Sequence, residues 1–262
     1  MRKLSVLAVG VIAAFAMATL ASAATGANGD GRPPLPPGAV QVSENVYYLG
    51  KKNVDGVELE GYAHVLRAKA HASQSGANAA GRKPPKACYS LLGYPAWATA
   101  ENWKVNTDGA PDSVSSTTML SGIETAIGAW EDASGADIFG MGETDNDVHP
   151  NTNLDGQNVV QFGDAGGAGT VAVTYIWGSR RTPIVEWDMI FGDNWEWDAS
   201  EAGSLTAFDF LGVATHEIGH AAGLGHAANS CSQETMYAYV GFGETHQRTL
   251  NAGDIAGITS LY

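Results

Sequence analysis

Basic side chains are scarce in this 262-residue chain, which has 14 Lys and Arg against 28 Asp and Glu. Residues 87–262 hold four basic and 23 acidic side chains, whereas residues 24–86 carry a net charge of +3. Phosphate binding requires clustered Lys and Arg, so the acidic segment excludes nucleic acid as a partner. A net charge far from zero also keeps a protein soluble, and we expect a monomer.

Long apolar runs are absent beyond the first 23 residues. Residues 4–20 are apolar, follow two basic residues and precede an Ala-Ser-Ala cleavage pattern at 21–23. Residues 1–23 therefore have the pattern of a secretory signal peptide, with an uncleaved anchor as the alternative. No later stretch reaches the ~18 apolar residues that a membrane span needs. We expect a secreted, extracellular protein without stable membrane association after signal cleavage.

Cysteine is nearly absent as well, since Cys88 and Cys231 are the only two. In a secreted protein, two cysteines indicate one disulfide. A bridge between them would join positions 143 residues apart. On a loop-entropy estimate it would stabilise the fold by about 5 kcal/mol.

One short segment carries the pattern His-Glu-x-x-His-x-x-Gly-x-x-His at residues 216–226. On a helix, His216 and His220 lie one turn apart, about 6 Å along the axis, and present both imidazoles to one cation. His226 would lie about 15 Å away if the helix continued, so the chain must turn first. Gly223 is the residue that adopts a left-handed helix end at little steric cost.

Three neutral histidines and an open fourth position are the arrangement of a catalytic zinc site. The carboxylate of Glu217 can reach water at that position and act as the general base. A purely structural zinc site needs a fourth protein ligand, and the motif contains none. The pattern therefore predicts one catalytic Zn²⁺ bound by His216, His220 and His226.

A methionine follows the motif closely, since Met236 lies ten residues after His226. In this the chain resembles the metzincin metalloproteases, in which a tight turn with a methionine forms an apolar floor beneath the zinc ligands. Residues 184–191, 193–197 and 253–262 resemble the matrixin branch, the family of the matrix metalloproteases. The resemblance covers roughly residues 88–262. It implies an α+β fold: a twisted, mostly parallel sheet with an active-site helix and a C-terminal helix.

The resemblance also implies an activity, that of a zinc-dependent metalloendopeptidase acting on protein or peptide substrates through a water activated by Glu217. The alternatives are a catalytically inactive binding or envelope protein with this fold, and a processing peptidase or toxin of narrow specificity. Intact Glu217 and the complete set of histidines favour the enzyme over the inactive protein.

Substrate residues follow from the same resemblance. An extended peptide is expected to pair with an edge strand that contains Val171, Ala172 and Val173. Tyr237 is expected to line the pocket for the side chain that follows the scissile bond. Tyr239 lies where some metzincins keep a tyrosine near the metal, and the alternative is a wall or core aromatic.

The sequence bears on two further kinds of metal site, a structural zinc and calcium. Matrixins often bind a second zinc through histidines ahead of the catalytic helix, but residues 150–215 contain none, so we expect no structural zinc. His64, His71, His149 and His246 are interpreted as ordinary loop residues. Calcium is possible because acidic loops offer oxygen ligands. The candidate ligands are Asp145, Asp147, Asp155, Asp164 and Asp193.

Hydrophobic periodicity organises the region after residue 88. We expect strands near 102–106, 158–162, 169–177 and 184–191, and helices at 117–133, 207–222 and 252–261. A polar loop is expected at 140–156. Asp254 is expected to cap the last helix.

Residues 24–87 are interpreted as a propeptide or accessory segment with a linker, ahead of a catalytic domain at 88–262. We expect a flexible leader at 24–38, a hairpin with strands at 46–49 and 57–65, and a linker at 71–87. In matrix metalloproteases a propeptide cysteine occupies the fourth zinc position. A switch of this kind at Cys88 is the alternative to the disulfide. The basic segment is also expected to lie against the acidic domain.

Overall fold

The structure is a computed structural model that describes residues 32–69, 87–167 and 169–262. The predicted signal peptide, His71 and all but the last residue of the predicted linker lie outside these ranges. Within them, no helix is both long enough and apolar enough to cross a membrane.

One mixed sheet, nine-stranded in the described residues, forms the centre of the fold, in the order β1-β2-β3-β8-β9-β7-β5-β6, with β13 (Tyr239–Val240) paired to β3. Four neighbouring strands run parallel: β9 (Thr182–Gly192), β7 (Val159–Gly163), β5 (Glu101–Asn106) and β6 (Phe139–Thr144). Strand β8 (Thr170–Ser179) pairs antiparallel with β9. All ten residues of β8 are buried, as expected for a central strand rich in β-branched and aromatic residues.

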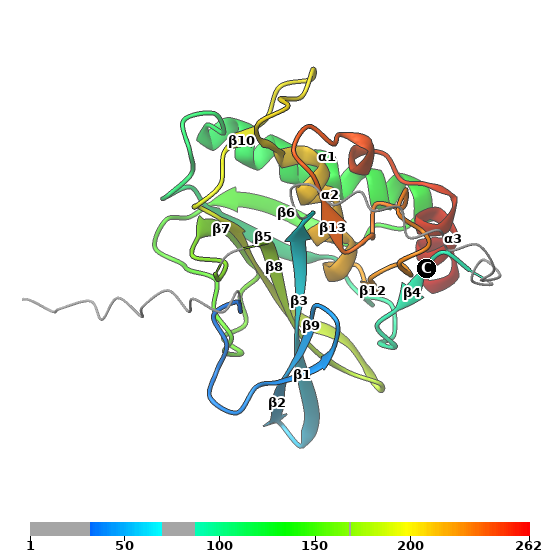
Figure 1. Ribbon diagram of the computed structural model, residues 1–262. Helices are drawn as coiled ribbons and strands as arrows, with labels where there is room; N and C mark the ends of the chain where they lie inside the picture. Colours follow the sequence, from blue (N-terminus) through cyan, green and yellow to red (C-terminus); the bar gives the residue numbers. More distant parts are fainter. Residues whose placement is uncertain (1–31, 70–86, 168) are drawn as a thin grey trace, which may run out of the picture.

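The N-terminal residues extend this sheet as three antiparallel strands: β1 (Val40–Ser43), β2 (Val46–Val54) and β3 (Val57–Ala68). The turn between β2 and β3 is Asp55-Gly56, and both residues have positive φ (52° and 84°). Two such residues match the backbone twist of a tight hairpin. The predicted hairpin is thus confirmed, with longer strands. It projects beyond the rest of the sheet at the bottom of Figure 1.

Three helices pack together over the sheet: α1 (Ser116–Ser134), α2 (Phe210–Ala221) and α3 (Ala252–Leu261) (Figure 1). Ser115 is the N-cap of α1, and its side chain accepts a hydrogen bond from Thr118 N (3.2 Å); Gly135, with φ of 70°, is the C-cap. The predicted α+β fold, with parallel central strands, an active-site helix and a C-terminal helix, is confirmed.

Two apolar clusters lie on the two faces of the sheet. The larger, on the helix side, contains Trp103, Trp130 and Trp187. The smaller one, which we term the hairpin cluster, joins the N-terminal strands to β8. Its members are Tyr47, Leu49, Leu59, Ala63, Val65, Ala165, Val173, Tyr175 and Trp177.

The loop predicted at 140–156 is wrong at its start, because Phe139–Thr144 form the edge strand β6. Hydrophobic alternation does not reveal this strand, because Gly140 and Gly142 interrupt the pattern. A side chain at Gly142 would collide with the ring of Trp103, so glycine lets that indole pack across the strand.

Short elements complete the fold. Two small sheets pair β4 (Ser90–Leu91) with β12 (Leu224–Gly225), and β10 (Trp197–Asp198) with β11 (Phe208–Asp209); a 3-10 turn, η1 (His246–Arg248), precedes α3. The predicted disulfide between Cys88 and Cys231 is present. It attaches the chain ahead of β4 to the segment between His226 and Met236.

Candidate metal centre

Helix α2 carries the first part of the motif, and its position is fixed at its N-terminus. Asp209 is the N-cap residue and accepts a hydrogen bond from Gly212 N (2.6 Å). The same carboxylate, which is buried, forms an ion pair with Arg248. A capped helix start and a paired charge orient α2 beneath β8.

His216 and His220 are both oriented by backbone carbonyls. Nδ1 of His216 lies 2.7 Å from Thr235 O, and Nδ1 of His220 lies 2.8 Å from Leu224 O. A carbonyl only accepts, so each Nδ1 carries the proton and each Nε2 keeps a free lone pair. The Nε2 of His216 is buried and has no hydrogen-bond partner among the described residues.

The chain turns after α2, as the motif predicts. The helix ends at Ala221, and Gly223 has φ of 105°. The turn brings His226 back, so that its Nε2 lies 3.2 Å from the Nε2 of His220. The ring centroid of His216 lies 4.8 Å from that of His220 and 5.4 Å from that of His226.

Burial keeps these imidazoles neutral. It lowers the pKa of His216 to about 4 and the pKa values of His220 and His226 well below the usual range. His216 and His226 each have a buried nitrogen without a hydrogen-bond partner among the described residues. Neutral rings of this kind fit a divalent cation, which would accept their lone pairs.

Glu217 lies on the side of α2 that faces β8. Thr174 Oγ1 donates a hydrogen bond of 2.5 Å to Oε2 of Glu217, while Oε1 is buried without a partner among the described residues. Burial raises the pKa of this carboxyl to about 8, and the hydrogen bond from Thr174 opposes the rise. Thr174 thus fixes Oε2 of Glu217, and Oε1 is available to accept a proton.

The methionine turn lies directly under α2. A side chain at Gly219 would collide with the sulfur of Met236 and approach the ring of Trp130 to 2.6 Å, so only glycine permits this packing. Asp254 accepts hydrogen bonds from the amides of Thr235 (2.7 Å) and Met236 (3.1 Å). Asp254 therefore does more than the predicted capping: it holds the turn whose carbonyl orients His216.

A fourth histidine lies at the site, and here the sequence interpretation is wrong. His64 is not a loop residue: it lies in β3 and is buried. One ring nitrogen from each of His64, His220 and His226 lies within 4.8 Å of the other two, and His216 lies beside this group, with its ring centroid 4.8 Å from that of His220. Burial lowers the pKa of His64 to about 3, with a contribution from His216. No local pattern identifies it, because a single histidine in an apolar strand resembles a core residue.

Pairing with β3 covers the predicted substrate residues. Val171, Ala172 and Val173 are buried in β8, and Ala172 and Val173 pair with Leu66 and Val65. Beyond the methionine turn, Tyr239 pairs with β3 in parallel and its hydroxyl donates to Glu44. The side chain of Tyr237 lies under Lys69, whose Nζ is 5.6 Å from the ring centroid.

The acidic candidates for calcium do not form a cluster. Asp145 is paired with Lys104 (2.7 Å). Asp155 accepts from Asn151 (2.9 Å), and Asp164 accepts from Gly166 N (2.9 Å). In the described ranges, no three acidic side chains present oxygens to one point. Calcium binding by these three residues, Asp147 and Asp193 stays a prediction.

Comparison with known proteins agrees with this geometry. The sequence profile of the matrixin peptidase family matches residues 96–262. The chain is a matrixin. The match includes α2, the turn at Gly223, the methionine turn and α3.

Individual relatives match over shorter segments. The chain is 40% identical to human (Homo sapiens) matrilysin over 60 residues, which is 23% of this matrixin and 22% of matrilysin. It is 39% identical to human matrix metalloproteinase-26 over 72 residues, 28% of this chain and 25% of the relative. It is 39% identical to metalloendoproteinase 4-MMP of Arabidopsis thaliana over 70 residues, which is 27% of this chain and 20% of the relative. The matched segments thus span about a quarter or less of each relative.

Proposed function

We propose that this matrixin is a secreted zinc-dependent endopeptidase, with His216, His220 and His226 as the zinc ligands and Glu217 as the general base. The observation that carries the proposal is the pair of unsatisfied buried atoms on one helical turn, Nε2 of His216 and Oε1 of Glu217. Buried polar groups are ordinarily paired, and a divalent cation with its water would satisfy both.

The chemistry follows from the two oxygens of Glu217. When bound, Zn²⁺ supplies a Lewis acid that polarises a peptide carbonyl and lowers the pKa of a coordinated water toward about 7. Thr174 holds Oε2, which leaves Oε1 to accept the proton of the attacking water. The same oxygen then donates that proton to the departing amine nitrogen, and the carboxylate is regenerated.

Substrate binding and secretion belong to the same proposal. We assign peptide binding to Val171–Val173 of β8, on the side that β3 covers in the structure, with Tyr237 and Tyr239 on the opposite wall. The substrates are proteins or peptides. Secretion rests on the signal pattern at residues 1–23, and N-terminal sequencing of the protein recovered from culture medium tests it.

The decisive experiment compares the wild-type chain with Glu217→Gln and His220→Ala. Zinc content is measured by mass spectrometry, and hydrolysis of quenched fluorescent peptides is measured before and after brief trypsin treatment, stopped with a trypsin inhibitor. We expect Glu217→Gln to keep one zinc per chain and to lose at least about 100-fold in rate. His220→Ala should bind zinc more weakly than the wild type and lose it to a chelator sooner. Zinc-loaded wild type that hydrolyses nothing in either form would instead support an inactive binding protein.

A further inference from the structure

The edge of β8 is occupied by the chain's own N-terminal strand. Strand β3 pairs antiparallel with β8 from Glu60↔Gly178 to Arg67↔Thr170. His64 is opposite Thr174, the residue that holds Glu217. An extended peptide can add to a sheet only where backbone groups are unpaired. No second peptide can therefore pair along β8 while β3 is in place.

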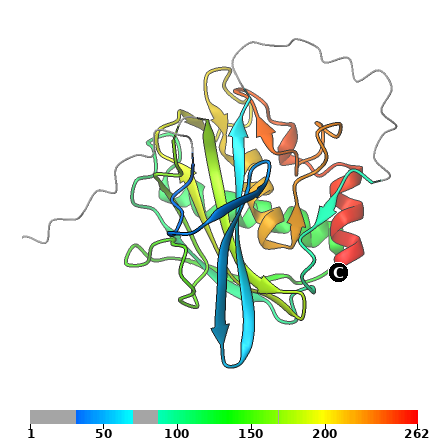
Figure 2. The same ribbon diagram turned by 60° about the horizontal axis from the view of Figure 1, so that its bottom comes forward.

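The other edge of β3 pairs with β2 over most of its length and, at its C-terminal end, with the segment after the methionine turn. Arg67 N donates to Ala238 O (3.1 Å), and Lys69 N donates to Val240 O (2.8 Å). Figure 2 shows β3, in cyan, between β8 in yellow-green and β13 in orange. Strand β3 thus lies between both walls of the proposed substrate cleft.

Strand alternation directs His64 toward the metal centre. Its neighbours Ala63 and Val65 belong to the hairpin cluster on the far face of the sheet, so His64 points to the helix side. Its ring centroid lies 4.6 Å from His220 and 5.8 Å from His226. Nδ1 of His64 is buried and has no hydrogen-bond partner among the described residues.

A fourth imidazole changes the type of site. The motif supplies three nitrogen ligands and leaves one position open, which is the condition for catalysis. A tetrahedral zinc with four protein ligands has no position for water or for a substrate carbonyl. His64 is the side chain that would close this position.

Several contacts hold the N-terminal segment in place besides the strand pairing. Gly61 lies flat under the ring of Trp177, where an added Cβ would approach to 2.7 Å. Lys69 pairs with Glu244 at 2.6 Å, which is one contact between the basic segment and the acidic domain. The first contact lies within β3 and the second directly after its C-terminal end.

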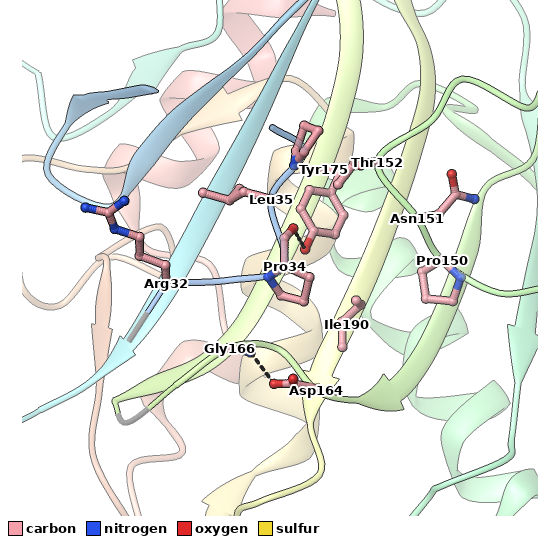
Figure 3. A pocket seen from close by; sticks show the side chains of 11 residues that line it. Arg32, Pro34, Leu35, Pro150, Asn151, Thr152, Asp164, Gly166, Tyr175 and Ile190 are labelled. Atoms are coloured by element: carbon pink, nitrogen blue, oxygen red, sulfur yellow. Dashed lines mark hydrogen bonds between the residues drawn. The ribbon is translucent and has the colours of Figure 1, made fainter. Parts of the chain in front are cut away.

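The residues before β1 also contact the sheet, at the end of the predicted leader. Tyr175 OH donates to the carbonyl of Pro34 (2.8 Å), beside a cavity of about 580 Å³ that is lined by Arg32, Leu35 and Ile190 among others (Figure 3). Tyr175 lies on the face of β8 opposite to Thr174. The N-terminal segment therefore contacts both faces of β8.

We propose that residues 39–69 are an internal inhibitor of this matrixin: β3 occupies the substrate position on β8, and His64 is the fourth nitrogen ligand of the metal. The chain is latent until β3 leaves β8. This inference rests on the proposed zinc site. It replaces the cysteine switch considered from the sequence, because Cys88 is in a disulfide.

The test measures the open coordination position directly in the full chain. Cobalt(II) replaces zinc, and free imidazole is titrated while the visible absorption bands of the metal are recorded. Imidazole can reach the histidines through a pocket of about 360 Å³ that is lined by His64 and His226 among others. We expect the wild type to show no imidazole-dependent change. His64→Ala should bind imidazole at least tenfold more tightly, because the probe fills the vacated position.

Two further variants complete the design. His149→Ala removes an exposed histidine from a distant loop and should behave as the wild type. His64→Gln, with circular dichroism as the check of folding, covers the case in which His64→Ala does not fold, and it should also admit imidazole. X-ray absorption of the zinc protein should show the multiple scattering of four imidazole rings in the wild type and of three in either His64 variant, where water takes the fourth position.

The outcomes separate the two proposals. If the wild type binds imidazole as readily as the His64 variants, the fourth-ligand assignment is overturned while the zinc site stands. If the double variant His216→Ala, His220→Ala leaves the metal content unchanged, the zinc site itself fails. An unchanged number of imidazole ligands in both His64 variants also overturns the inference.

Discussion

Asp254 is the residue whose removal should damage both stability and the metal centre. Its carboxylate is fully buried and accepts three backbone hydrogen bonds, from Thr235 (2.7 Å), Met236 (3.1 Å) and Asn251 (2.9 Å). Hydrogen bonds to charged groups contribute about 1.5–3 kcal/mol each, and unpaired buried donors cost about as much. Since the three bonds share one carboxylate and are not additive, we expect Asp254→Ala to cost about 4 kcal/mol.

The effect should extend to the metal, because Thr235 O orients His216. Loss of a residue that orients a ligand typically weakens metal affinity about 10- to 100-fold. Urea denaturation of the zinc-loaded chain measures the stability, and competition with a chromophoric chelator measures the affinity. Asp132→Asn, an exposed change on α1, is the control. Stability and zinc affinity of Asp254→Ala both equal to those of the control would refute the reasoning.

Three further outcomes are expected. Burial raises the pKa of Asp188 to about 8, so its stabilising contribution is complete below the unfolded pKa near 4 and is lost as pH rises through 8. The unfolding free energy should therefore fall between pH 4 and 8, and Asp188 contributes at most about 1.4 kcal/mol per pH unit to that fall. Asp188→Asn should make the fall smaller, and a pH profile identical to that of the wild type contradicts this. Gly223→Ala should lower the free energy of unfolding by about 1–3 kcal/mol and weaken zinc binding. The reason is that Gly223 has φ of 105° and that the added Cβ would lie 2.7 Å from the side chain of Leu261. An unchanged Tm in calorimetry counts against this prediction. Joint replacement of Cys88 and Cys231 by alanine should lower stability by up to about 5 kcal/mol in urea titrations, and a loss below about 1 kcal/mol would show that the loop constraint is unimportant.

Local sequence is sufficient for the parts of the fold that local physics determines. The helix predicted at 117–133 agrees with α1 to within one residue at each end, because its apolar residues recur at helical spacing and Ser115 and Gly135 are strong boundary residues. The turn after α2 is predictable because a single residue, Gly223, has to supply it. Strand β6 is not, because its glycines serve the packing of a distant tryptophan, which its own sequence does not reveal.

Only part of the metal centre can likewise be predicted from the sequence. His216, Glu217 and His220 share a helical turn, so their spacing alone indicates a metal site. His64 is 152 positions from the nearest of them, and its place depends on the pairing of β3 with β8. Strand register across such a distance is set by side-chain packing on both faces of the sheet, which no local motif encodes.

The same strand that blocks the site also protects the fold. Without β3, strand β8 would be an edge with unpaired backbone groups, which readily pair with other chains. Val173, Tyr175 and Trp177 of the hairpin cluster, now nearly fully buried, would meet water. An enzyme that binds peptides by strand addition needs this edge, yet cannot leave it exposed while it folds without risking aggregation. Inhibition by β3 and protection of the β8 edge are therefore one set of contacts, so a substitution that weakens latency, such as one at Gly61, should also lower the yield of folded protein.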